Sequence, residues 1–130
     1  TPTKSVLRDI VATRDQTVAI ALVADQAASK KDAYWTTFLN QDTAVFTGPE
    51  KIAKKFDFPV VQMTILKVKR GYYTLECELL FEHPRNTADG EITETFTRKF
   101  EEQIRRDPTF WLWSHKRWKH KRPASSASNN

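Results

Sequence analysis

Apolar side chains recur at helical spacing in three parts of the chain. In residues 5–12 the apolar positions lie three and four apart, and in residues 92–104 an apolar residue returns at every fourth position. Both patterns predict amphipathic helices. The second should end at Asp107-Pro108, because the residue before a proline disfavours helical backbone. A third helix is expected to begin at Thr47 and to end before Phe58-Pro59.

The other apolar stretches predict strands. The segment "TVAIALVAD", residues 17–25, is apolar without alternation, which is typical of a strand buried on both faces. The segments "VVQMTILKVKR" (60–70) and "YYTLECELLFE" (72–82) are separated by a glycine turn at Gly71, so they are expected to pair as a hairpin. The polar stretch 25–41 is expected to be a long loop.

The order of these elements predicts an α/β fold, with layered helices around a mixed, mostly buried sheet. Nothing before Val18 supplies the neighbours that a doubly buried strand needs, so we expect the chain to be the C-terminal part of a longer protein. Residues 1–122 are expected to belong to a single domain. Residues 123–130, rich in serine and asparagine, are expected to form a disordered tail.

The positive charge of the chain is concentrated at one end. All 16 acidic residues and 16 of the 21 lysines and arginines lie in residues 1–114, so the net charge of +5 resides in the tail. Three of the four tryptophans lie in the same region, within "PTFWLWSHKRWKHKRP", residues 108–123. Such local basicity suggests an anionic surface nearby, whether phosphate, nucleic acid or lipid, and a solvated tail is the simpler alternative.

Common catalytic and metal-binding motifs do not occur in the sequence. The three histidines and the single cysteine lack metal-ligand spacing, and there is no phosphate-binding glycine loop and no Gly-x-Ser-x-Gly. We therefore expect neither a metal nor a cofactor. Glu50 keeps two interpretations, a capping box with Thr47 or a helix N-terminus facing an anion. Asp25-Gln26 is either the ligand-binding end of a buried strand or an ordinary turn.

Four stretches, in this order and spacing, resemble the bacterial lipid A biosynthesis acyltransferases, the lauroyl and myristoyl transferase group. They are "ADQ" at 24–26, "FLNQDTAVFTGPEKIAKKF" at 38–56, "FPVV" at 58–61 and "PTFWLWSHKRWK" at 108–119. The resemblance is to the C-terminal half of that family and covers about residues 7 to 122. The "FLNQDT" wording is similar to Bacteroidetes-type members, whereas many other members have a glycine where Asn40 stands.

The resemblance implies a glycerol-phosphate-acyltransferase-like α/β fold and an enzyme at the cytoplasmic face of the bacterial inner membrane. It implies transfer of a fatty acyl chain from an acyl-carrier-protein or coenzyme A thioester to a hydroxyl of a lipid A precursor or a related membrane lipid. In that family a His-x-x-x-x-Asp/Glu motif supplies the general base. None of His83, His115 and His120 is followed by an acid at the fifth position, so we expect the catalytic pair upstream and this chain alone to be inactive.

The resemblance also suggests binding residues. Substrate contact is expected from Arg8, Asp25, Gln26, Asn40, Gln41, Thr47, Gly48 and Glu50. Headgroup contact is expected from Arg117, Trp118, Lys119, Lys121 and Arg122, because tryptophan and cations suit a lipid interface. For Trp111 and Trp113, packing beneath the sheet and lipid contact both stay open. A nucleic-acid-binding module that uses the basic aromatic tail is the alternative function, and the neutral body argues against it.

Overall fold

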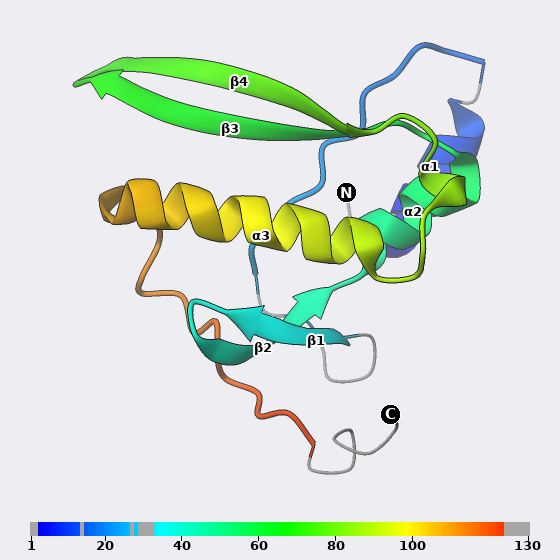
Figure 1. Ribbon diagram of the computed structural model, residues 1–130. Coiled ribbons are helices and arrows are strands. Elements are labelled where there is room, and N and C mark those ends of the chain that lie inside the picture. The colour runs from blue at the N-terminus through cyan, green and yellow to red at the C-terminus, as the bar shows by residue number, and fades with distance from the viewer. Residues whose placement is uncertain (1–2, 14, 27, 29–32, 124–130) are drawn as a thin grey trace.

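A computed structural model describes residues 3–13, 15–26, 28 and 33–123. The long helix α3 lies between two antiparallel hairpins, β1–β2 on one side and β3–β4 on the other, with α1 and α2 gathered near its N-terminal end (Figure 1). In chain order the elements are α1 (Thr3–Ala12), β1 (Ala33–Phe38), β2 (Gln41–Phe46), α2 (Gly48–Phe56), β3 (Val60–Lys69), β4 (Tyr72–Phe81), the 3-10 turn η2 (Pro84–Asn86), α3 (Glu91–Arg106) and the 3-10 turn η3 (Pro108–Phe110).

The α/β class expected from the sequence is confirmed. All three predicted helices form, and α2 and α3 end where Pro59 and Pro108 require. The β3–β4 hairpin also forms, and it turns at Gly71, whose φ of +79° suits glycine. The described strands form two separate two-stranded sheets rather than one mixed sheet. The disordered tail expected at 123–130 lies, apart from Pro123, outside the described residues.

The strand expected at residues 17–25 is not present. Residues 17–24 form neither helix nor strand, and no backbone hydrogen bond joins them to another segment that the structure describes. Their apolar side chains are poorly covered, since Val23 is 75% exposed. A strand buried on both faces needs a neighbour on each side, and the described elements provide none. The apolar run at residues 17–24 therefore does not form the predicted strand.

The long loop expected at residues 25–41 is wrong from residue 33 onward. Strand β1 pairs with β2 in a register that runs from Ala33 opposite Phe46 to Phe38 opposite Gln41. The two-residue turn between them, Leu39-Asn40, has φ values of 49° and 63°. Two positive φ values in a two-residue hairpin match a type I′ turn, and asparagine tolerates this backbone better than most residues. Asn40 can therefore adopt the left-handed backbone for which glycine is otherwise the usual choice.

Helix α3 and hairpin β1–β2 form the hydrophobic core. Ile92 and Ile104 of α3 are buried, as are Phe38 and Val45 of the hairpin. The Phe38 and Phe100 rings stack with their centroids 5.7 Å apart. The apolar stripe read from the sequence therefore faces β1–β2, and α3 fixes that hairpin in place.

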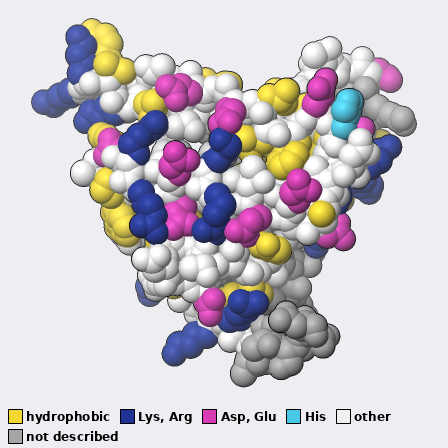
Figure 2. Space-filling view, viewed as in Figure 1, with side chains coloured by type: hydrophobic (Ala, Val, Ile, Leu, Met, Phe, Trp, Pro, Cys, Tyr) yellow, Lys and Arg dark blue, Asp and Glu magenta, His cyan; other side chains and the backbone are white. Residues whose placement is uncertain are grey.

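Ion pairs on α3 position the β1–β2 turn. The carboxylate of Glu101 is buried and accepts hydrogen bonds from Arg98 and Arg105, each at 2.6 Å, and from the backbone N–H of Leu39 at 3.2 Å. Arg98 also pairs with Glu94. Figure 2 shows basic and acidic side chains alternating over this face, which agrees with a body of balanced charge.

Hairpin β3–β4 carries an uncovered apolar face. Its polar side is directed to α3, where Glu78 pairs with Lys99 at 2.7 Å. The side chains of the opposite face share alternate positions and are all exposed: Val61, Met63, Ile65, Leu75, Cys77 and Leu79. A mostly buried sheet is therefore not seen in the described part of the chain. The helices that the structure describes include none with the length and hydropathy of a membrane span.

We expect Gly90→Ala to destabilise the fold more than Gly71→Ala does. Both glycines have positive φ, +85° and +79°, so an added side chain costs each about 1–2 kcal/mol of backbone strain. A Cβ at Gly90 would also lie 2.6 Å from the Tyr34 ring, whereas Gly71 faces open space. Urea unfolding of both variants measures the difference. Equal losses of unfolding free energy would contradict a close packing role for Gly90.

Candidate functional site

The basic tail folds back onto the body through Arg117. This side chain is buried, and its Nη1 donates hydrogen bonds to the carbonyl oxygens of Gln26 and Ala44, both at 2.9 Å. The guanidinium also lies 5.8 Å from the centre of the Phe38 ring. Arg117 thus joins Gln26, strand β2 and the tail. We call Arg117 and Trp118, together with these partners, the tail clamp.

Asp25 balances part of the charge that the tail clamp buries. Burial lowers the pKa of the Arg117 guanidinium, and the negative charge of Asp25 acts in the opposite direction. One carboxylate oxygen of Asp25 and the Nε of Arg117 are buried without a hydrogen-bond partner. Buried polar atoms usually have partners, so these two atoms are among the exceptions that the described residues show.

Trp118 is held by the same hairpin. Its indole N–H donates to the hydroxyl of Thr43 at 2.8 Å, and its ring meets Trp111 edge to face. Trp111 in turn contacts Phe38 and Phe100. Packing therefore accounts for Trp111. Trp118 suits this position because its ring fills space while its N–H reaches a polar partner.

Two of the five residues expected at the headgroups bond to the body of the protein, and headgroup contact stays a prediction for them. Arg117 is buried and Trp118 is half-buried, and both bond to the body rather than projecting from it. Arg122 lies 3.8 Å from Asp42. Lys119 and Lys121 are exposed, so headgroup contact stays a prediction for them. It also stays a prediction for Arg122, which lies near Asp42.

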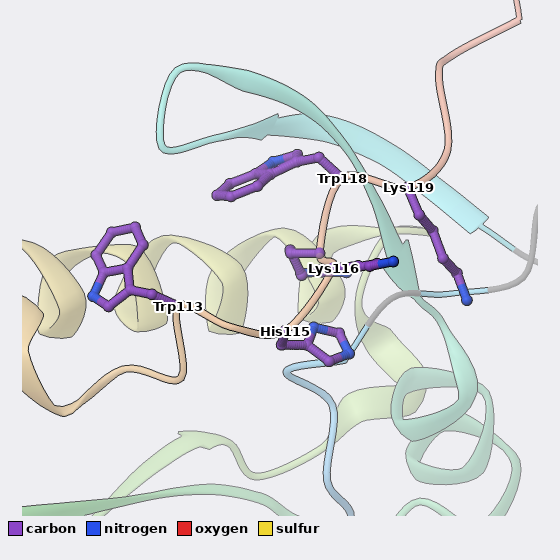
Figure 3. A pocket seen from close by; sticks show the side chains of 6 residues that line it. Trp113, His115, Lys116, Trp118 and Lys119 are labelled. Atoms are coloured by element: carbon purple, nitrogen blue, oxygen red, sulfur yellow. The ribbon is translucent and has the colours of Figure 1, made fainter.

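A shallow cavity of about 370 Å³ opens along the tail, lined by Trp113, His115, Lys116, Arg117, Trp118 and Lys119. In Figure 3, Lys116 and Lys119 extend to the same side, away from Trp113. Trp113 is 56% exposed, and its neighbours Phe110 and Leu112 are exposed as well. The exposed tryptophan is thus Trp113, not the Trp118 that the sequence favoured. The lining combines lysines with indole rings, and its cations suit a ligand with an anionic group.

Glu50 caps a distant helix rather than its own. The Thr47 side chain makes no capping hydrogen bond, so the capping box expected there is wrong. The Glu50 carboxylate is buried and accepts from the backbone N–H of Gly90 at 2.6 Å, the N–H of Thr93 at 3.0 Å and the Thr93 hydroxyl. It satisfies donors at the start of α3 that Gly90, which has no side chain, leaves open. Both oxygens are occupied, so Glu50 holds α2 to α3, and substrate contact by Glu50 stays a prediction.

The residues expected to bind substrate lie in several places. Asp25 and Gln26 meet the tail clamp. Asn40 and Gln41 are exposed at the β1–β2 turn, where Asn40 lies 3.4 Å from Arg105. Thr47 and Gly48 lie at the start of α2, and Arg8 is exposed on α1.

Thr43 and Ala44 were not expected as partners of the tail, because they lie between the loop expected at residues 25–41 and the helix expected from Thr47. The one available signal was their place inside "FLNQDTAVF", a stretch that carries the family resemblance. No cluster of three or more His, Cys, Asp or Glu side chains able to hold a metal ion occurs among the residues described.

We expect Glu50→Gln to lower stability. An amide keeps one acceptor oxygen and brings an N–H₂ group against backbone donors, so about 1.5–3 kcal/mol of unfolding free energy should be lost. Glu102→Gln, the same change on the exposed side of α3, is the control and should have little effect. Thermal and urea unfolding measure both. Wild-type stability in Glu50→Gln would contradict the capping role.

Comparison with known proteins identifies the family of the chain. The family model described as bacterial lipid A biosynthesis acyltransferase matches residues 1–120 of the 130-residue chain. No curated protein and no solved structure matches the chain. The match includes residues 17–26, both hairpins, α3 and the tail clamp. The chain therefore belongs to the bacterial lipid A biosynthesis acyltransferase family.

Proposed function

We propose that this chain is the C-terminal part of an acyltransferase that moves a fatty acyl chain from an acyl-carrier-protein or coenzyme A thioester to a hydroxyl of a lipid A precursor. The family supports acyl transfer in lipid A biosynthesis. The general base is a His-x-x-x-x-Asp/Glu pair outside these 130 residues, since no histidine of the chain has an acid at the fifth position. The domain that the pair completes includes residues 1–122.

The observation that carries this proposal is the tail clamp. It brings together three of the four stretches that resemble the family: "ADQ" through Gln26, "FLNQDTAVF" through Ala44 and the tail through Arg117. These stretches are far apart in the sequence, and their convergence at a polar point with Asp25 is what a substrate-binding edge requires. Asp25 and Gln26 are the substrate contacts that this geometry favours most.

The cavity beside the tail clamp suits the acceptor. A lipid A precursor presents phosphate groups as well as acyl chains, and the cavity is lined by two cations, Lys116 and Lys119, which extend away from Trp113. Exposed Lys119 and Lys121 would meet the anionic membrane surface on the cytoplasmic side of the inner membrane. Because of the "FLNQDT" motif, we still predict that the chain is a Bacteroidetes-type member of the family.

Nucleic-acid binding by the tail has less support. Such binding uses cations that are free to follow a phosphate backbone, with aromatic rings exposed for stacking. Arg117 is buried in the tail clamp, Arg122 lies beside Asp42, and Trp118 is bonded to Thr43. The family match over residues 1–120 instead associates the basic tail with lipid A biosynthesis.

We expect the purified 130-residue chain to transfer no acyl group, because it lacks the general base. Joined to an upstream segment with the His-x-x-x-x-Asp/Glu pair from the same reading frame, it should acylate a lipid A precursor from a radiolabelled thioester. Mass spectrometry of the lipid product measures transfer. Turnover by the chain alone above a heat-denatured control would contradict the upstream base. A joined protein inactive with both thioesters would contradict the proposed activity.

We expect the double variant Lys119→Gln/Lys121→Gln to bind acidic vesicles less tightly. Each cation near an anionic surface contributes about 1 kcal/mol, so binding should fall by roughly 30-fold at low salt and less where screening is strong. Lys55→Gln/Arg106→Gln removes the same charge from exposed positions on α2 and α3. Vesicle co-sedimentation at two salt concentrations compares them. Equal losses in both variants would show a response to net charge and contradict a contact by the tail.

A further inference from the structure

Two segments that are far apart in the sequence expose hydrophobic side chains at one end of the molecule. The turn of hairpin β3–β4 and the C-terminal end of α3 lie at the same end in Figure 1, and the ammonium group of Lys67 lies 5.1 Å from the centre of the Phe110 ring. Six large side chains of these segments are each between 56% and 67% exposed: Val68, Tyr72, Tyr73, Phe110, Leu112 and Trp113. We call these six side chains the hairpin-tip surface. Hydrophobic side chains exposed together mark an interaction surface.

The charges beside the hairpin-tip surface are positive. Residues 58–75 contain no acid and three exposed cations, Lys67, Lys69 and Arg70. Residues 108–123 also contain no acid, and Asp107 before them accepts a hydrogen bond from the Thr109 hydroxyl at 2.6 Å. Figure 2 shows lysine and arginine side chains beside hydrophobic ones at the tip of the hairpin. The partner of this surface should therefore be both apolar and anionic.

The backbone of the hairpin turn suits an apolar environment. The β3–β4 ladder continues to the pair formed by Lys69 and Tyr72, so only Arg70 and Gly71 stand between the paired residues. Hydrocarbon offers no donor or acceptor, so a segment that approaches it must satisfy its own backbone hydrogen bonds. The ammonium group of Lys69 lies 4.3 Å from the centre of the Tyr72 ring. Lysine and tyrosine each combine an apolar body with a polar end, which suits the boundary between headgroups and hydrocarbon.

The chemistry of the hairpin-tip surface favours an anionic lipid surface over other partners. Lipids offer hydrocarbon to the six hydrophobic side chains and phosphate to the three cations. A nucleic acid would stack on the aromatic rings, but it offers little to Val68 and Leu112. A second copy of the chain, docked through the same surface, would bring three cations against three cations, and like charges repel.

We propose that the hairpin-tip surface inserts into the headgroup region of a membrane that contains anionic lipids. Trp113 belongs to this surface and also lines the cavity beside the tail clamp. Insertion would therefore bring the bilayer that holds the lipid acceptor to the edge of that cavity, a consequence that rests on the proposed function. The contact is distinct from the one predicted for Lys119, which extends away from Trp113 (Figure 3).

Tryptophan fluorescence of the 130-residue chain tests the insertion. Vesicles of phosphatidylglycerol and phosphatidylcholine with brominated acyl chains should quench Trp113, because bromine quenches an indole only at close range. Trp113→Phe should remove most of the quenching, since the other three tryptophans are half-buried: Trp35, Trp111 and Trp118. Equal quenching in the wild type and in Trp113→Phe would overturn the insertion. So would binding to the vesicles without quenching.

A matched pair of double variants tests the hydrophobic contribution. Val68→Ser/Leu112→Ser removes one side chain from each segment of the hairpin-tip surface and should weaken vesicle binding about 30-fold. Leu7→Ser/Val11→Ser makes the same exchanges at exposed positions of α1 and should keep binding within about threefold of the wild type. Co-sedimentation measures both, and equal losses would overturn the proposal. If thermal unfolding shows that Val68→Ser/Leu112→Ser does not fold, the comparison of Trp113→Phe with the wild type decides.

The outcomes separate the membrane contact from other partners and from the proposed function. Tight binding of soluble polyglutamate without quenching by brominated lipid would assign the surface to an acidic protein and overturn the proposal. Self-association without quenching, abolished in Val68→Ser/Leu112→Ser, would assign it to a second copy with the same consequence. Quenching of Trp113 in a joined protein that transfers no acyl group would support the contact while the function fails. Acyl transfer by a joined protein without quenching would overturn the contact and leave the function intact.

Discussion

The arrangement of the body depends on the buried carboxylate of Glu50 at the start of α3. A helix begins with backbone N–H groups that lack partners, and Gly90 brings no side chain to meet them. Glu50 on α2, which lies 40 residues before Gly90 in the sequence, accepts these hydrogen bonds. With its N-terminus fixed, α3 presents Ile92 and Ile104 to β1–β2 and Lys99 to β3–β4, so one charge-assisted contact sets the position of both hairpins.

A second buried charge divides the basic tail into two parts. Arg117 is buried, where it bonds backbone carbonyls and experiences the negative charge of Asp25. Lys119 and Lys121 are exposed to solvent. Removing a charge from water is costly unless hydrogen bonds replace the hydration. Arginine suits this position because its planar group reaches two carbonyls with one nitrogen and lies near the Phe38 ring. The density of cations in the tail thus reflects a structural need as well as an anionic partner.

The local features of the fold were predictable from the sequence, and the pairing of distant segments was not. The stripe of α3, the glycine turn of β3–β4 and the proline that ends each long helix depend on residues close in the chain. The role of Glu50 was misread because its spacing from Thr47 imitates a local cap. Strand β1 was missed because polar residues precede its aromatic ones. In the sequence Arg117 is recognisable only as a cation, because no nearby residue indicates that its partners are two carbonyl groups 91 and 73 residues away.

The separation of these partners has a consequence for synthesis. A chain leaves the ribosome from its N-terminus, so β1 and β2 emerge long before the arginine that locks them to residue 26. Until about 73 further residues have followed Ala44, the carbonyls that Arg117 will bond must be satisfied by water. Contacts between residues so far apart form late, after the local helices and hairpins. Nascent molecules would therefore hold an unlocked hairpin and the exposed apolar residues 17–24 at once, which is the stage at which chaperones would matter most.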